Sequence, residues 1–301
     1  MSLEKWIVRP GESRVIDVEL VRKLKVGMIG GQIDILGHDE PGARVEVHSV
    51  SGKELKISID GDVLEIDHPQ LGWDNFLEVF KSFGSNSAKA QISVLVPRKI
   101  ALTFGMVSAG ALISGLTTSA RLSTVSGELQ IESVTGDLDL NSVSGEISVQ
   151  SHVGAINAHS ISGDITVAGE ISRFTSDTVS GNVFIDAFGR CDRISTNAVS
   201  GSLTARLPAS TGTKYVVNTV SGTLQLDNSV IRGTRGRGFS STTEGDGNFY
   251  TDVLANSVSG SVSVVRRNDQ EEGETHPSGA SAGAASEPEN DDDAFMSGGH
   301  A

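Results

Sequence analysis

The sequence is poor in cysteine, aromatic residues and proline. Cys191 is the only cysteine, aromatic residues make up 5% of the 301 residues, and there are seven prolines. One cysteine excludes an intrachain disulfide, and a lone thiol is more typical of a reducing compartment than of an oxidising one. Because aromatics are so few, a core must be built mainly from Val, Ile and Leu, which favours strands over helices.

Long apolar runs are absent as well. No stretch approaches the ~20 apolar residues of a membrane-spanning helix, so we expect no membrane span. The first segment, MSLEKWIVRPGESR, lacks an apolar run of the length that a signal peptide needs. These absences predict a cytoplasmic protein.

Positive charge is missing from the last part of the chain. Residues 268–301 contain nine acidic residues and no Lys or Arg, so the net charge of −14 becomes −5 when those nine charges are left out. A body with this charge has no general attraction for nucleic acid, and we expect no nucleic-acid partner. The acidic, low-complexity composition of 268–301 predicts a disordered tail.

One tripeptide, Val/Ile-Ser-Gly, is abundant. Its glycines are Gly127, Gly145, Gly163, Gly181, Gly201, Gly222 and Gly260, and the first four of them are evenly spaced. Gly136 and Gly154 divide these gaps into units of nine residues. Each unit alternates apolar and polar residues after the glycine, which is the pattern of a strand with one buried face. Because nine is odd, a corner must reset the alternation, and the Ser-Gly pair is the expected place for it.

A strand and a corner on a fixed period predict an all-β fold, a single-chain parallel β-solenoid or β-helix. Its coils would have about 18 residues, each made of two nine-residue units. We expect an irregular β-strand cap over 1–100, regular coils over 101–267 with an insertion at 227–252, and the tail 268–301. Coils stacked in sequence order would form columns of equivalent residues. One expected inward column is Val125, Val143, Ile161, Val179, Val199, Val220 and Val258.

Segment 73–83, WDNFLEVFKSF, predicts one short helix. Its apolar residues recur at the spacing of one helical face. They include Trp73, Phe76, Phe80 and Phe83. The simpler interpretation is a cap that closes an end of the apolar core, and the alternative is a face for a partner.

Segment 233–239, GTRGRGF, follows Arg232 and contains Arg235 and Arg237. The three arginines lie in a glycine-rich loop, where they would contact an anion or a partner, or simply remain exposed. Glu128, Glu146 and Asp164 each follow a repeat glycine, and we interpret them as solvated charges on the rim of the coils, with a column of oxygens for Ca²⁺ as the alternative. No catalytic, cofactor-binding or metal-ligating pattern is found: zinc spacing and a Gly-x-Ser-x-Gly elbow are both missing.

The chain resembles a bacterial "putative adhesin" family of β-strand-repeat proteins, a domain of unknown function. The resemblance rests on the repeated Val-Ser-Gly units and on GGQIDILG at 30–37, VEVHSVSG at 45–52, ARLPASTGTKYVVNTVSG at 205–222 and EGDGNFYTDVLANSVSGSVSV at 244–264. It covers most of 20–266 and implies a β-helix-like fold, without catalytic residues.

The sequence therefore favours a non-enzymatic scaffold that is structural or mediates protein interactions, with an unknown protein partner or self-association and no cofactor. The alternative is a surface adhesin or a polysaccharide-binding protein, if the chain is exported. A β-helix enzyme that acts on carbohydrate is a third class.

Overall fold

The computed structural model describes residues 3–68, 88–227, 229–232, 238–245 and 249–267, and every regular element within these ranges is a strand. Residues 1–268 form one compact unit, and the described residues within it form 22 strands. The prediction of an all-β chain is confirmed. The helix predicted at 73–83 and the tail 268–301 lie outside the described residues. In the described part, no helix has the length and apolarity needed to cross a membrane.

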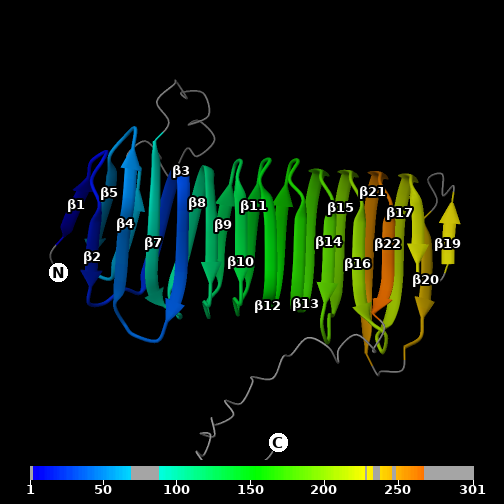
Figure 1. Ribbon diagram of the computed structural model, residues 1–301. Helices are drawn as coiled ribbons and strands as arrows, with labels where there is room; N and C mark the ends of the chain where they lie inside the picture. The colour runs from blue at the N-terminus through cyan, green and yellow to red at the C-terminus, as the bar shows by residue number, and fades with distance from the viewer. Residues whose placement is uncertain (1–2, 69–87, 228, 233–237, 246–248, 268–301) are drawn as a thin grey trace, which may run out of the picture. The chain divides into compact units, whose positions relative to one another are not determined.

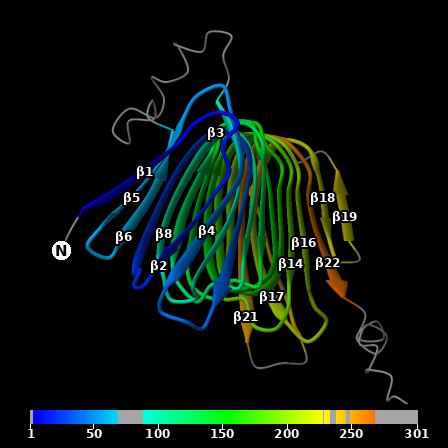
Figure 2. The ribbon, with the colours of Figure 1, turned by 60° about the vertical axis from the view of Figure 1, so that its left-hand side comes forward.

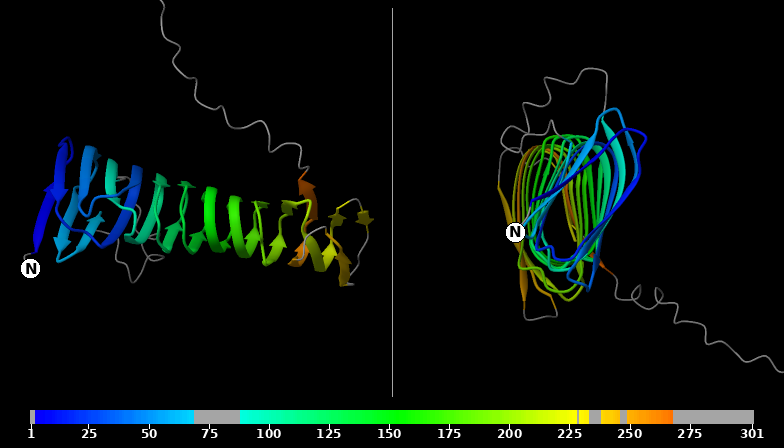
Figure 3. Two further views of the ribbon diagram at one scale, coloured as in Figure 1. Left: turned by 90° about the horizontal axis from the view of Figure 1, so that it is seen from below. Right: turned by 90° about the vertical axis from the view of Figure 1, so that its left-hand side faces the viewer.

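The strands form two faces of a flattened tube, which is visible when the unit is viewed along its axis (Figures 2 and 3). Four long strands bend from one face to the other, namely β3 (Lys23–His38), β8 (Ala101–Ser114), β12 (Glu146–Ser160) and β13 (Ile165–Ser180).

Face A contains, in spatial order, β1 (Glu4–Val8), β5 (Leu55–Asp60), β6 (Val63–Asp67), the first halves of β3 and β8, β9 (Ala120–Thr124), β11 (Leu138–Ser142), the second halves of β12 and β13, β15 (Arg193–Ser200), β21 (Tyr250–Ser259), β17 (Gly212–Ser221) and β20 (Phe239–Thr243).

Face B contains β2 (Arg14–Val18), β4 (Ala43–Ser51), β7 (Lys89–Pro97), the second halves of β3 and β8, β10 (Glu128–Glu132), the first halves of β12 and β13, β14 (Val183–Ala187), β16 (Leu203–Pro208), β22 (Val262–Arg267), β18 (Thr223–Leu226) and β19 (Ser229–Arg232). Figure 1 shows the strands of the two faces side by side.

The register of the parallel strands follows the sequence repeat. On face A, Arg121 pairs with Asp139, and these partners are 18 residues apart. Glu128 and Glu146 pair at the same separation on face B. From β13 to β15 the offset grows to 20 residues, as between Asp177 and Asn197. The alternating apolar side chains of these strands are buried between the faces, where removal from water stabilises the coils.

The Ser-Gly corner joins face A to face B, and each of its residues has a role in stacking. The Ser144 hydroxyl donates to the carbonyl of Val125, one coil earlier, at 3.0 Å, and Ser162 repeats this bond to Val143 at 3.1 Å. Gly163 lies so close to the preceding coil that an added Cβ would be 1.9 Å from the carbonyl oxygen of Gly145. Glycine is therefore needed here for close backbone approach.

The coil that comes last in the sequence does not lie at the end of the stack. Strands β21 and β22 are inserted between the coil of β15 and β16 and the coil of β17 and β18 (Figure 1). The expected stacking in sequence order is thus wrong at this end. Arg266 contacts the coil that precedes it in the sequence, where its Nε donates to Asp227 Oδ1 at 2.7 Å and its Nη2 donates to the Thr213 hydroxyl at 2.7 Å. That contact is available in either order. Arg267 distinguishes the two orders, because its guanidinium group reaches the carboxylate of Asp186 on β14 only when β22 lies beside β16.

The two ends of the coils are closed by antiparallel strands. β1 and β2 pair antiparallel with β5 and β4, while β19 and β20 pair antiparallel with β18 and β17. Within the described part of 227–252, the strands therefore extend the two faces, whereas the sequence suggested an insertion that projects from a coil. Short strands of this kind limit the exposed edge of a sheet.

Candidate functional site

An exposed apolar row follows the Ser-Gly corner across several coils. Its members are the Val or Ile residues of the repeated tripeptide, and we call it the valine row. In spatial order the valine row is Ile161, Val179, Val199, Val258 and Val220, with exposed fractions of 52%, 49%, 51%, 52% and 58%. Apolar side chains of this size that are half exposed and adjacent on neighbouring strands form a contiguous apolar patch, unlike single exposed apolar residues, which are common on protein surfaces.

The valine row corrects the predicted inward column. Val125 is buried and Val143 is partly buried, but the remaining members point outward. The residue before each of them is a small one, and it takes the inward position at the corner. Thr178 is buried beside the exposed Val179, and the buried Ser160 donates its hydroxyl to the carbonyl of Gly163 at 3.0 Å. Successive side chains of a strand point to opposite sides, so a valine that follows an inward residue on face A faces solvent, as Val179 does after Thr178.

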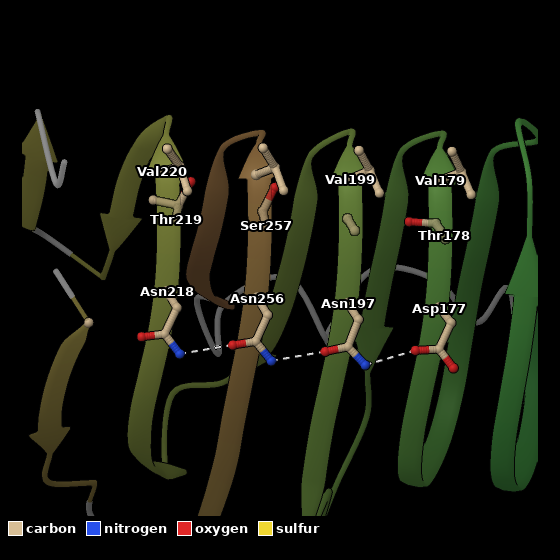
Figure 4. A pocket seen from close by; sticks show the side chains of 13 residues that line it. Asp177, Thr178, Val179, Asn197, Val199, Asn218, Thr219, Val220, Asn256 and Ser257 are labelled. Carbon is tan, nitrogen blue, oxygen red and sulfur yellow. Dashed lines mark hydrogen bonds between the residues drawn. The ribbon is translucent and has the colours of Figure 1, made fainter. Parts of the chain in front are cut away.

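A second row of side chains runs parallel to the valine row, two residues earlier on each strand. We call it the amide row, and its members are His159, Asp177, Asn197, Asn256 and Asn218. Asn218 Nδ2 donates to Asn256 Oδ1 at 2.8 Å, and Asn256 Nδ2 donates to Asn197 Oδ1 at 2.9 Å. Asn197 Nδ2 then donates to Asp177 Oδ1 at 2.8 Å (Figure 4). This ladder fixes the rotamer of each amide.

The two rows enclose a groove. From β13 to β17 the groove has a volume of about 510 Å³, and the small residues Thr178, Ala198, Ser257 and Thr219 lie between the rows. Figure 4 shows the amide row on one side and the labelled valines on the other. A second hollow of about 370 Å³ continues the groove beyond Asp177, toward Ser123. Ligand sites in proteins have volumes of this order and a similar mixture of apolar walls and few oriented polar groups.

One carboxylate lines the second hollow, and three others follow the corner on the far side of the tripeptide. The lining carboxylate is Asp177, the last acceptor of the amide ladder, whose Oδ2 is 3.3 Å from His159 Nδ1. Glu128, Glu146 and Asp164 are exposed beyond the corner, and Glu128 and Glu146 are direct register partners. In the described residues, no group of three or more His, Cys, Asp and Glu side chains is placed to hold a metal ion.

The residues singled out from the sequence lie elsewhere. Arg232 is the last residue of β19 at the end of face B, and Arg235 and Arg237 lie outside the described residues. The aromatic set Trp73, Phe76, Phe80 and Phe83 also lies outside them. The amide row was missed, although the sequence contains its signal: an Asn, Asp or His recurs two positions before most of the tripeptides.

Two titratable groups at the end of β6 have shifted pKa values. Burial, and then the nearby Glu65, raises the pKa of Asp67 to about 7. Burial lowers the pKa of the adjacent His68 to about 4, and His68 Nδ1 accepts a hydrogen bond from the Ile29 N–H at 3.3 Å. Asp67 is the register partner of Gly27 on β3. Both residues belong to the line of register partners that crosses face A from strand to strand and includes the amide row.

We expect Asp67→Asn to stabilise the protein above pH 7 and to have no effect on stability near pH 4. A carboxyl group whose pKa is raised by folding binds its proton more tightly when folded, so the wild type loses stability as pH rises from about 4 to 7. The variant avoids this loss. A rise of roughly three pKa units corresponds to about 4 kcal/mol, and because Asp67 is only partly buried, screening by water reduces the expected gain at pH 8 to on the order of 1–3 kcal/mol. Urea denaturation at pH 4 and pH 8 measures the difference. Asp60→Asn, at the exposed last residue of β5, is the control. Equal effects of Asp67→Asn at both pH values would contradict the prediction.

Comparisons with known proteins relate the chain to one described family. The model of a family described as "Toastrack DUF4097" matches residues 32–265. No curated protein matches the chain. Among solved structures, a "putative lipid binding protein" from Parabacteroides distasonis is similar, with 14% identity, a TM-score of 0.49 and coverage of 86% of this chain and 98% of that chain. A "putative adhesin" from Bacteroides fragilis has 14% identity, a TM-score of 0.42 and coverage of 86% and 99%. A "putative adhesin" from Parabacteroides merdae has 11% identity, a TM-score of 0.42 and coverage of 86% and 97%.

Proposed function

The chain belongs to the Toastrack DUF4097 family, and we propose that it is a non-enzymatic scaffold whose stacked coils, a β-solenoid, present one groove to a protein partner. The groove between the amide row and the valine row carries the proposal. It crosses the strands of β13, β15, β21 and β17 and is built from residues that recur from coil to coil. A repeated surface on a rigid stack suits the recognition of an extended partner.

The composition of the groove supports binding rather than catalysis. Its lining consists of Asn, Thr, Ser, Ala, Val and Gly side chains with one carboxylate, Asp177. Amides and hydroxyls at these positions orient a ligand, whereas general acid-base catalysis needs groups whose pKa values are tuned to the reaction. The groups with large pKa shifts among the described residues, Asp67, His68, Cys191 and Tyr215, all lie outside the groove lining.

A cytoplasmic location is part of the proposal. Cys191 is buried, burial raises the pKa of its thiol to about 11, and a lone thiol fits a reducing compartment. The alternative function, a surface adhesin or a polysaccharide-binding protein, requires export of the chain. Fractionation of the producing cell separates the two, because recovery only from the cell surface or the medium would favour the alternative.

Photo-crosslinking in the producing cell tests the proposed site. A photoreactive phenylalanine analogue in place of Val199 is expected to give a discrete crosslinked protein species. The same analogue in place of Val153, which is 40% exposed on β12 and outside the groove, is the matched control. Identical crosslinks from both positions would show that the groove is not the contact surface. A glycan array with the purified protein tests the alternative.

A further inference from the structure

We propose that the groove binds an apolar protein segment that carries Lys or Arg side chains. The inference rests on the proposed function, because it names the chemistry of the partner at the same groove. The valine row would contact the apolar side chains of the segment, and the carboxylates on both sides of the row would pair with its cations. Two separate features of the described residues, one apolar and one electrostatic, support this assignment.

The apolar feature is the length and continuity of the valine row. Its five members lie at the ends of the neighbouring strands β12, β13, β15, β21 and β17, each about half exposed. Neighbouring strands are ~4.8 Å apart, so the row extends over roughly 19 Å. An extended segment of about six residues covers that distance at ~3.3 Å per residue. Val143 continues the row into the second hollow, where it is already partly buried.

The electrostatic feature is the sign of the charges around the groove. Among the described residues, no Lys or Arg lines either hollow, while Asp177 lines both. Glu128, Glu146 and Asp164 follow the corner on consecutive coils, three residues after Val125, Val143 and Ile161. Glu128 and Glu146 are register partners, so two like charges lie on neighbouring strands and repel each other. Glu128 also accepts a hydrogen bond from Gln130 Nε2, and Asp164 accepts one from the Asn182 N–H at 2.7 Å, and both carboxylates keep their negative charge. A cation from a partner would relieve that repulsion.

The same charges argue against other occupants. The tail 268–301 contains nine acidic residues and no Lys or Arg, so it is repelled from this surface. A second copy of the chain, with a net charge of −14, is repelled in the same way, as are nucleic acid and anionic lipid. A segment in which apolar residues alternate with Lys or Arg is complementary to both features.

The amide row adds hydrogen-bonding groups to the same groove. Each Nδ2 in the ladder uses one N–H for its neighbour, as Asn256 does toward Asn197 at 2.9 Å. An amide nitrogen has a second N–H, which is not used by the ladder and is available for the peptide carbonyls of a bound segment. The ladder holds these groups in place before binding, which lowers the entropy that binding must overcome.

Fluorescence anisotropy with three labelled peptides tests the proposal. The peptides have equal length, sufficient to cover the valine row, and alternate Lys with Leu, Glu with Leu, or Lys with Ser. The Lys-Leu peptide is expected to bind the full-length protein, more weakly as salt is raised because the ion pairs are partly exposed. The Glu-Leu and Lys-Ser peptides are expected to bind at least about fivefold more weakly, since each lacks one of the two contributions. Equal binding of all three peptides, or tighter binding of the Glu-Leu peptide, would overturn the proposal.

Two pairs of substitutions assign the binding to the groove. The double variants Val179→Ser/Val199→Ser and Glu146→Gln/Asp164→Asn are each expected to weaken binding of the Lys-Leu peptide by about fivefold or more. All four residues are exposed, so folding should be retained, and the melting temperature checks it. Val153→Ser and Glu132→Gln, exposed outside both hollows, are the matched controls. Peptide binding that survives both double variants would overturn the inference. If crosslinking from Val199 nevertheless finds a partner, the proposed function stands and only its cationic, apolar chemistry is wrong.

Discussion

Gly163→Ala is expected to destabilise the protein by about 4 kcal/mol or more, a loss that is exceptional for a single substitution. An added Cβ would lie 1.9 Å from the carbonyl oxygen of Gly145 and 2.8 Å from its carbonyl carbon, and both are backbone atoms. The backbone there cannot move aside without breaking the hydrogen bond from Ser162 N–H to the Val143 carbonyl, which is 2.8 Å long. Equilibrium denaturation in urea, followed by circular dichroism, measures the loss.

Gly189→Ala is the matched control for this prediction. Gly189 follows β14, has a φ of +70° and has no atom within 4 Å of an added Cβ. Alanine at positive φ costs about 1–2 kcal/mol. Gly163, by contrast, is not among the glycines with positive φ, so its substitution tests close stacking alone. A loss at Gly163 no larger than the loss at Gly189 would show that the corners tolerate a side chain and that stacking does not explain the repeated glycine.

Asp186→Ala is expected to cost about 3–5 kcal/mol, the usual effect of removing one partner from a buried ion pair. Asp186 on β14 is 4% exposed, and its two carboxylate oxygens accept bonds from Arg206 on β16 and from Arg267 on β22. Arg267 is itself 8% exposed, and its guanidinium group lies 4.0 Å from the centre of the Phe188 ring. Loss of the carboxylate leaves two guanidinium groups without the negative charge that both contact.

Hydrogen exchange can show which strands lose stability in Asp186→Ala, in addition to the total loss of unfolding free energy. Hydrogen exchange of Asp186→Ala should be fastest in β21 and β22, because Arg267 holds the last coil against β14 from two strands away. Asp192→Ala, which removes the partner of Arg190 in a surface ion pair with side chains 70% and 54% exposed, should cost less than about 1 kcal/mol. The interpretation of Asp186 as the residue that secures the last coil would be wrong if both variants lose the same stability, or if exchange in β22 is unchanged.

Of the two ion pairs of Asp186, the sequence repeat can predict one and not the other. Asp186 and Arg206 are register partners one coil from each other, and such a pair follows from the repeat once its period is known. Arg267 is 81 residues from Asp186 in the sequence. No periodic argument connects these two residues, because the coils between them do not stack in sequence order.

The repeated tripeptide by itself determined the all-β fold class and pointed to the family. Ser and Gly recur because each coil repeats the same hydroxyl-to-carbonyl bond and the same close approach of two backbones. A requirement that is the same at every corner therefore appears in the sequence as a repeat. The amide row leaves a similar trace two residues before most of the tripeptides, and the sequence carried that information although its meaning was not evident.

The tertiary structure alone decided which way the valines point and where the last coil lies. On β13 the alternation of face A continues to the end of the strand, so Ser176 and Thr178 are buried while Asp177 and Val179 are exposed, and the sequence does not show at which residue the corner interrupts it. Strands β15, β21 and β17 carry the same tripeptide in the same register, so their local energies allow either order. A contact between distant residues, Arg267 with Asp186 on β14, selects the order in which β22 lies beside β16. A groove formed by neighbouring strands depends on both decisions, which is why it emerges only once the coils are stacked.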